Sequence, residues 1–346
     1  MNTISEVSPS SAASHRSRLA PFFLWLALFY TSWLSYVVIA NQWEALRTHW
    51  PISVAMAFGS YIAGSTPMGG GTVGFPVLVL LFDQPATLGR NFGLAVQSIG
   101  MVSASIYILS SRQHVDWPLL RPALLGSLVG TIIGCTWIAP VVSDLWIQLT
   151  FGIIWASFGI MHLLRMRELV SAQGVSYLWR TRDWPLGLLI GVLGGIVASI
   201  TGVGIDMLIY AVLVLLYRAD LKIAIPTSVI LMAFTSVVGI TTNHLLAAAF
   251  PDRYSINPEV FANWLAAAPV VAVGAPFGAI VVNLISRTPT LILVSILCVV
   301  QFVWTLVDAH ITGWPLVVSL LAVAALVGVF HWLYRLGERA SHPERL

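Results

Sequence analysis

Long apolar segments separated by short polar loops make up most of the chain. The segments long enough to cross about 30 Å of hydrocarbon as helices cover 21–40, 91–110, 119–140, 145–164, 223–247, 263–285, 290–309 and 314–334. This pattern predicts an all-α polytopic membrane protein. Its single transmembrane domain, 21–335, follows a Ser-rich, disordered cytoplasmic N-terminus at 1–20.

Glycines interrupt two further apolar regions. The arms on either side of the breaks cover 52–66 and 72–82 in the first region and 185–199 and 206–217 in the second. Arms of this length are only about 16 to 22 Å long as helices, at 1.5 Å per residue, which is short of a full crossing. We therefore expect two re-entrant helical hairpins. Matched breaks of this kind mark the substrate site of many transporters, because backbone outside a helix must be enclosed at membrane depth.

The basic residues predict the orientation of the chain. With the N-terminus in the cytoplasm, only Arg47, Arg90 and Arg253 of the 17 basic residues fall outside. Both termini are then cytoplasmic, and the two hairpins enter from opposite faces. Residues 52–164 and 185–309 would form inverted-topology repeats, joined by a basic cytoplasmic loop at 165–184 and followed by a last helix at 314–334.

Residue identities support the repeat at a constant offset of 135 positions. The pairs that match are Gly59 with Gly194, Ala63 with Ala198, Thr66 with Thr201, and Gly69 with Gly204. Apolar runs match often by chance, so the glycines and threonines carry this argument.

The glycine breaks suit an anion. Helix N-termini offer free N–H groups and a positive dipole end, and glycine lets a ligand approach the backbone closely. The substrate-binding residues that we expect are Gly69, Gly70, Gly71, Thr72, Arg90, Asn91, Gln97, Gly202, Gly204, Thr227 and Ser228. Tight helix packing is the competing explanation for the single glycines, an interfacial anchor for Arg90, and interhelical hydrogen bonding for Gln97.

Asp206 is the only carboxylate deep within the predicted membrane segments. Acids at this depth are costly and indicate function, here coupling to H⁺ or Na⁺ or a counter-charge to a substrate cation. Capping the second arm of the hairpin is the structural alternative. His162 and His244 lie near the ends of predicted helices, and we expect both at the membrane interface.

The composition limits the remaining functions. Hydrophobic residues make up 58% of the chain and charged residues 9%, as in an integral membrane protein, and the scattered basic residues do not indicate nucleic-acid binding. Cys135 and Cys298 are isolated, so neither a metal site nor a disulfide is predicted. With no clustered nucleophile and base and no nucleotide-binding loop, we expect neither an enzyme nor a cofactor.

One motif resembles a known family. Gly64-x-x-Pro67-x-Gly69-Gly70-Gly71-x-x-x-Phe75-Pro76-x-Leu78, followed by Pro85 and Gly89-Arg90-Asn91, resembles the glycine-rich hairpin of the TauE/SafE family of sulfite and sulfonate exporters. The second half, with Gly202-x-Gly204 and Pro226-Thr227-Ser228, is similar to the second copy in that family. The resemblance extends over roughly residues 50–335. The chain departs from the pattern at Asp206, which stands opposite Gly71 where the family generally repeats glycine.

The resemblance implies a secondary transporter in the bacterial cytoplasmic membrane. Its substrate would be a small sulfur-containing or organic anion such as sulfite, sulfoacetate or another sulfonate. An anion channel and a permease for small carboxylates are the alternatives. The exact substrate, the direction of transport, the coupling ion and a homodimeric assembly stay open.

Overall fold

The computed structural model describes residues 18–171, 180–281 and 288–341. Within these ranges all regular structure is helical. Most of the N-terminal segment expected to be disordered, residues 1–17, lies outside the described residues. Nine helices in the described part are long and apolar enough to cross a membrane, which confirms a multi-pass membrane protein.

The elements follow the order of the predicted segments closely. The first half contains α2 (Ala20–Ile39), α3 (Trp43–Thr48), α4 (Trp50–Ser65), α5 (Gly71–Pro76) continued by the π-helix η1 (Val77–Leu81), α6 (Ala86–Ser110), α7 (Trp117–Ile133) continued by η2 (Gly134–Ile138) and η3 (Ala139–Val141), and α8 (Asp144–Ser171). The second half contains η4 (Arg180–Arg182), α9 (Asp183–Thr201), α10 (Ile205–Ala211) continued by η5 (Val212–Leu216), α11 (Leu221–Ala249), α12 (Pro258–Val281), α13 (Thr288–Asp308) and α14 (Gly313–Ser341).

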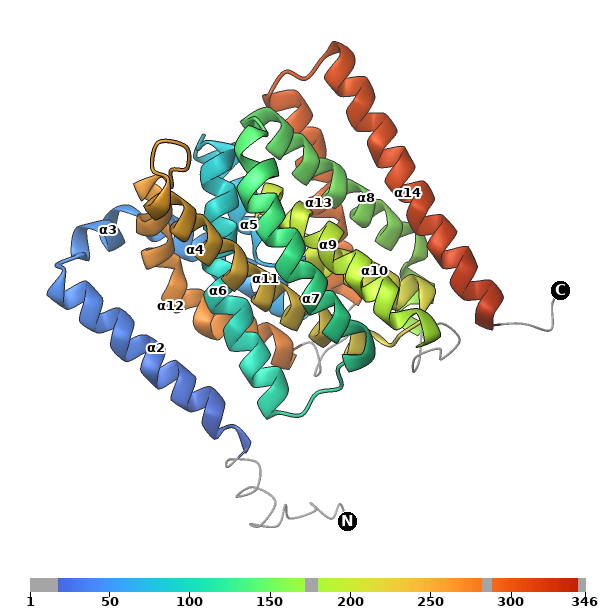
Figure 1. The fold of residues 1–346 in the computed structure, drawn as a ribbon, viewed down its shortest axis with the longest axis horizontal. Coiled ribbons are helices and arrows are strands. Elements are labelled where there is room, and N and C mark those ends of the chain that lie inside the picture. Colours follow the sequence, from blue (N-terminus) through green and yellow to red (C-terminus); the bar gives the residue numbers. More distant parts are fainter. Residues whose placement is uncertain (1–17, 172–179, 282–287, 342–346) are drawn as a thin grey trace, which may run out of the picture.

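The broken helices lie inside the bundle and the terminal helices lie outside it. In Figure 1, α2 and α14 flank the other helices on opposite sides, with the N-terminal end of α2 and the C-terminal end of α14 toward the same end of the bundle. Every residue of η5 is buried, and so is all of α10 except the partly exposed Leu208. The breaks are therefore surrounded by protein, as backbone outside a helix requires at this depth.

Two boundaries differ from the predicted ones. The helix expected at 185–199 runs from Asp183 to Thr201, and at this length it could cross the membrane on its own. It starts earlier because proline is tolerated in the first turn of a helix, so Pro185 does not mark its beginning. The loop expected at 165–184 is also shorter, because α8 continues to Ser171; residues 172–179 lie outside the described part.

The two halves repeat the same local structure at the predicted offset. Each broken helix ends in a π-helix, and Asp83 and Arg218, 135 positions apart, close the two regions with similar φ values of 52° and 55°. In each case the next amide donates to a carbonyl six residues earlier, at 2.9 Å. An internal repeat therefore exists in local structure, while the opposite orientation of its two copies stays a prediction.

Close helix contacts join the two halves. A Cβ on Gly130 of α7 would lie 2.2 Å from the carbonyl oxygen of Val192 in α9, and one on Gly191 of α9 would lie 2.2 Å from that of Ala123 in α7. Gly64 of α4 approaches Ala275 of α12 in the same way. Small residues allow such approaches in membranes, so packing accounts for single glycines such as Gly64 and Gly191.

The opposed orientation of the halves can be tested by labelling. Asp83 and Lys222 are exposed and begin the segments that follow the two broken helices. In a background without Cys135 and Cys298, cysteines at the two positions should react with an impermeant thiol reagent from opposite sides of the membrane. Labelling of both positions from the same side would mean that the repeats are parallel.

Candidate functional site

The two helix breaks pack directly against each other. A Cβ on Gly71, at the start of α5, would lie 2.2 Å from Cγ1 of Val203, which lies between α9 and α10. Gly69, Gly202 and Gly204 have φ values of 62°, 83° and 110°, a region that side chains other than glycine rarely adopt. Glycine at these positions is thus required by the backbone itself.

Threonines close both broken helix ends in the same way. The hydroxyl of Thr66 accepts from the amide of Met68 at 3.4 Å, and that of Thr201 accepts from the amide of Val203 at 3.4 Å. In the second break, the Thr201 hydroxyl also donates to the carbonyl of Val203 at 2.6 Å. These contacts provide hydrogen-bond partners for backbone N–H and C=O groups just beyond the helix ends, where no helical partner remains. This explains why the sequence repeats threonine here.

Gln97 of α6 and Asp206 of α10 both approach Gly69. A Cβ on Gly69 would lie 2.8 Å from Oδ2 of Asp206 and 2.8 Å from Oε1 of Gln97. The exposed fraction is 2% for Gln97 and zero for Asp206. The structure therefore brings together Gly69, Gln97 and Asp206, which the sequence had singled out separately.

Asp206 caps its helix with one oxygen only. Its Oδ1 accepts from the amide of Met207 at 3.0 Å in the first turn of α10, whereas Oδ2 has no hydrogen-bond partner among the described residues. The predicted capping role thus explains the position of Oδ1 but not that of Oδ2. Thr72, another predicted site residue, accepts from Nε1 of Trp155 at 2.8 Å and donates to the carbonyl of Met68.

A single face of α6 connects this centre to a cavity. Gln97 donates through Nε2 to the carbonyls of Gly93 and Gly202, both at 3.0 Å. One turn earlier than Gly93, the carbonyl of Arg90 lies 2.4 Å from where a Cβ on Gly202 would be. The break in the second half therefore rests on the backbone of α6 between Arg90 and Gln97.

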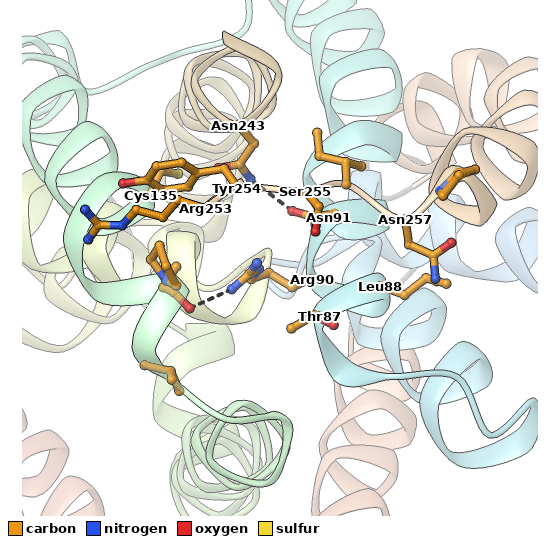
Figure 2. A pocket seen from close by; sticks show the side chains of 15 residues that line it. Thr87, Leu88, Arg90, Asn91, Cys135, Asn243, Arg253, Tyr254, Ser255 and Asn257 are labelled. Carbon is orange, nitrogen blue, oxygen red and sulfur yellow. Dashed lines mark hydrogen bonds between the residues drawn. The ribbon is translucent and has the colours of Figure 1, made fainter. Parts of the chain in front are cut away.

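The cavity has a volume of about 540 Å³, and Figure 2 shows the side chains that line it. It includes Arg90 and Arg253, two of the three basic residues predicted to lie outside. Its lining residues are Thr87, Leu88, Arg90, Asn91, Cys135, Ala139, Pro140, Val142, Asn243, Arg253, Tyr254, Ser255, Ile256, Asn257 and Pro258. Arg90 donates through Nη1 to the carbonyl of Ala139 at 3.1 Å, and its buried Nε has no partner in the described part of the chain. Asn243 donates to Asn91 at 2.9 Å.

The opposite end of the bundle is held by a polar cluster. Arg180 donates from both terminal nitrogens to Asp116, at 2.8 Å each, and from Nη1 to Asp183 at 3.3 Å. Thr227, a predicted site residue, accepts there from the amide of Asp116 at 2.9 Å. Ser228 follows it in α11 and bonds to the carbonyl of Ile225. Thr227 and Ser228 thus lie near one end of α11, whereas Asn243, near the other end, lines the cavity.

Some residues of the site were not found from the sequence. Asn243, Tyr254 and Cys135 line the cavity but were not among the predicted site residues. Arg253 also lines it, and the sequence had indicated only that this residue is one of three basic residues expected outside. His162 does not lie near a helix end as expected, because α8 continues from it to Ser171. It is fully buried, stacks on Tyr210 and bonds to its hydroxyl at 3.1 Å.

The comparison with protein families decides the family. A family model described as Sulfite exporter TauE/SafE matches residues 52–305. The chain belongs to the TauE/SafE family. The match confirms the resemblance in the motifs, and a membrane transporter of sulfur anions is the function that this family implies. Neither a curated protein nor a solved structure matches the chain.

The matched region of this TauE/SafE protein contains the whole site. Both helix breaks and all residues that line the cavity fall within 52–305. The two peripheral helices of Figure 1, α2 and α14, lie outside the matched range.

Gly202 provides a test of how closely the break rests on α6. Gly202→Ala places a methyl group 2.4 Å from the Arg90 carbonyl at a φ of 83°, so it should lower the melting temperature and weaken anion binding. Gly313→Ala is the matched control, because Gly313 also has a positive φ, 62°, but nothing within 4 Å of the added Cβ. That variant should lose only about 1–2 kcal/mol to backbone strain. Equal melting temperatures for the two variants, measured in detergent, would contradict the close contact.

Proposed function

We propose that this protein is a secondary transporter that moves a small sulfur-containing anion, such as sulfite, sulfoacetate or another sulfonate, across the bacterial cytoplasmic membrane. The observation that carries the proposal is Arg90, a cation in the membrane domain that lines the 540 Å³ cavity and whose buried Nε has no partner among the described residues. Such a guanidinium offers charge-assisted hydrogen bonds to an oxyanion.

The charges in the cavity favour an anion. Its described lining contains two arginines, Arg90 and Arg253, and no carboxylate. The amides of Asn91 and Asn257, with the hydroxyl of Ser255, supply neutral hydrogen-bond donors. The Tyr254 hydroxyl donates to the carbonyl of Thr136 at 2.7 Å. A lining of this kind raises the local concentration of anions and suits the three oxygens of a sulfite or sulfonate group.

The packing beyond the cavity favours an alternating-access transporter and disfavours an open channel. The breaks touch at Gly71 and Val203, and the small cavity beside Gly70 and Gln97 has a volume of about 10 Å³, no more than one water needs. An anion in the outer cavity could not pass this layer while the breaks are packed. Transport therefore requires the breaks to separate and the polar cluster around Arg180 to open.

The glycines at the breaks act after the anion has entered the outer cavity, when the breaks separate. In this conformation Gly69, Gly71 and Gly202 face side chains and backbone of the other half. The amides of Thr72, Val73 and Gly74 now donate to the carbonyls of Gly69 and Gly70. Once the breaks separate, we propose that backbone N–H groups of this segment receive the anion, as inferred from the sequence. We propose inverted-topology repeats as the basis of this movement, with both termini in the cytoplasm.

The proposal can be tested by flux measurements in proteoliposomes. The purified protein should exchange labelled sulfite or a sulfonate in the absence of ATP, and unlabelled competitors should show whether small carboxylates are also accepted. A rate limited only by the electrochemical gradient, without saturation, would instead indicate an anion channel. Failure of every anion tested to exchange would contradict the proposal.

Arg90→Gln tests the residue that carries the proposal. Glutamine can still donate to the Ala139 carbonyl but lacks the charge, so the dissociation constant for the transported anion should rise about 10- to 100-fold, corresponding to about 1.5–3 kcal/mol for a hydrogen bond to a charged group. The matched control is Arg47→Gln, which removes an exposed charge on α3 outside the cavity. Binding measured by isothermal titration should be unchanged in this control, and equal losses in both variants would mean that only the overall charge matters.

A further inference from the structure

Two buried oxygens that only accept hydrogen bonds converge beside Gly69. They are Oδ2 of Asp206 and Oε1 of Gln97, and neither has a partner among the described residues. A buried acceptor without a partner costs about 1–3 kcal/mol, and more if it carries charge. Two of them at the same place call for an explanation.

The orientation of Gln97 is fixed by its other contacts. Its Nε2 donates to the carbonyls of Gly93 and Gly202, both at 3.0 Å. Turning the amide over would place Oε1 against two carbonyl oxygens, which only accept hydrogen bonds. The amide oxygen is therefore the atom that faces Gly69 and Asp206.

A proton on Asp206 would provide the hydrogen-bond donor that these two oxygens lack. A neutral carboxyl group can donate through Oδ2 to Oε1 of Gln97, and the group no longer carries a charge in a fully buried position. A metal cation would need several oxygen ligands and space between them. The cavity that Gln97 lines is about 10 Å³ and is bounded by Met56, Gly70 and other residues but not by Asp206.

We propose that Asp206 and Gln97 form a proton-binding pair that couples anion transport to proton movement in the same direction. Protonation pairs the two side chains and removes the charge from Asp206, so the breaks can pack and separate while the proton and the anion are both bound. Loss of the proton leaves a buried carboxylate near an amide oxygen, and this charge opposes the same movement. The proposal rests on the proposed function in assigning the pair to an anion transporter, but proton binding itself can be measured without transport.

The other titratable groups packed around α10 are few. Helix α8 contributes His162, which bonds to Tyr210 one turn after Asp206. From α6 comes Arg90, two turns before Gln97. The remaining neighbours, α5, α9 and α11, bring no titratable side chain to the first turn of α10 in the described structure. Asp183 of α9 and Lys222 of α11 lie toward the opposite end of the bundle, and His244 lies near the C-terminal end of α11.

Asp206→Asn is the central variant. The asparagine amide can donate to Oε1 of Gln97 as the protonated acid does, so the fold and anion exchange at equal pH should be retained. A pH gradient should then no longer accelerate uptake, whereas in wild type an acidic side that also holds the anion should drive accumulation several-fold. Asp308→Asn, at an exposed position at the end of α13, is the matched control and should respond to the gradient as wild type does.

Infrared spectroscopy provides a readout independent of transport. Wild-type protein at neutral pH should show the carbonyl stretch of a protonated carboxyl group, which should disappear in Asp206→Asn and persist in Asp308→Asn. If this band is present but no anion is exchanged, the proton pair stands and the proposed function fails. Absence of the band in wild type would overturn the pair.

Two further results would also overturn the proposal. One is acceleration of wild-type exchange by a sodium gradient at constant pH that is lost in Asp206→Asn, since this would make Na⁺ the ligand. The other is loss of the pH response in His162→Gln with the response retained in Asp206→Asn, which would assign the titrating group to α8. Both are measured in the same proteoliposome assay.

Discussion

The requirement that backbone outside a helix be satisfied by protein determines the centre of this molecule. Two helices stop at membrane depth, and each break is covered chiefly by the other half of the chain. Val203 fills the space that Gly71 leaves, and Gln97 donates to the carbonyl of Gly202. The glycines are thus needed twice, for the left-handed backbone and for the closeness of the two breaks. If the two breaks separate, their backbone N–H and C=O groups lose these contacts and need new hydrogen-bond partners. A hydrated anion could supply such partners.

The two halves share local structure but differ in the side chains that carry chemistry. Both breaks end in threonine hydroxyl caps and π-helices at the same offset. At equivalent positions, however, Arg90 stands opposite Ile225, and Asp206 stands opposite Gly71. Arg90 therefore lines a cavity for which its counterpart Ile225 could not supply a charge, and an acid is present in only one break. A symmetric framework supports alternation between two states, whereas the asymmetric residues make those states chemically different.

The sequence predicted the fold better than the site. Apolar length located the long helices, and glycine located both breaks, because these signals depend on local composition. The extra length of α9 was missed because Pro185 sits inside its first turn. The cavity residues Asn243 and Tyr254 could not be predicted, because periodicity does not say which helix faces converge. The burial of His162 was missed for the same reason, because its hydrogen bond to Tyr210 joins segments 48 residues apart.

The spacing of Arg90 and Gln97 on α6 suggests how an anion and a proton could be linked. Seven residues of helix separate them by about 10 Å. Both residues also contact the second break, since the Arg90 carbonyl faces Gly202 and the Gln97 amide donates to the Gly202 carbonyl. A movement of this break therefore changes the surroundings of the anion cavity and of the Asp206–Gln97 pair together. If a proton on Asp206 changes the affinity for the anion, reciprocity requires the anion to change the affinity for the proton by the same factor.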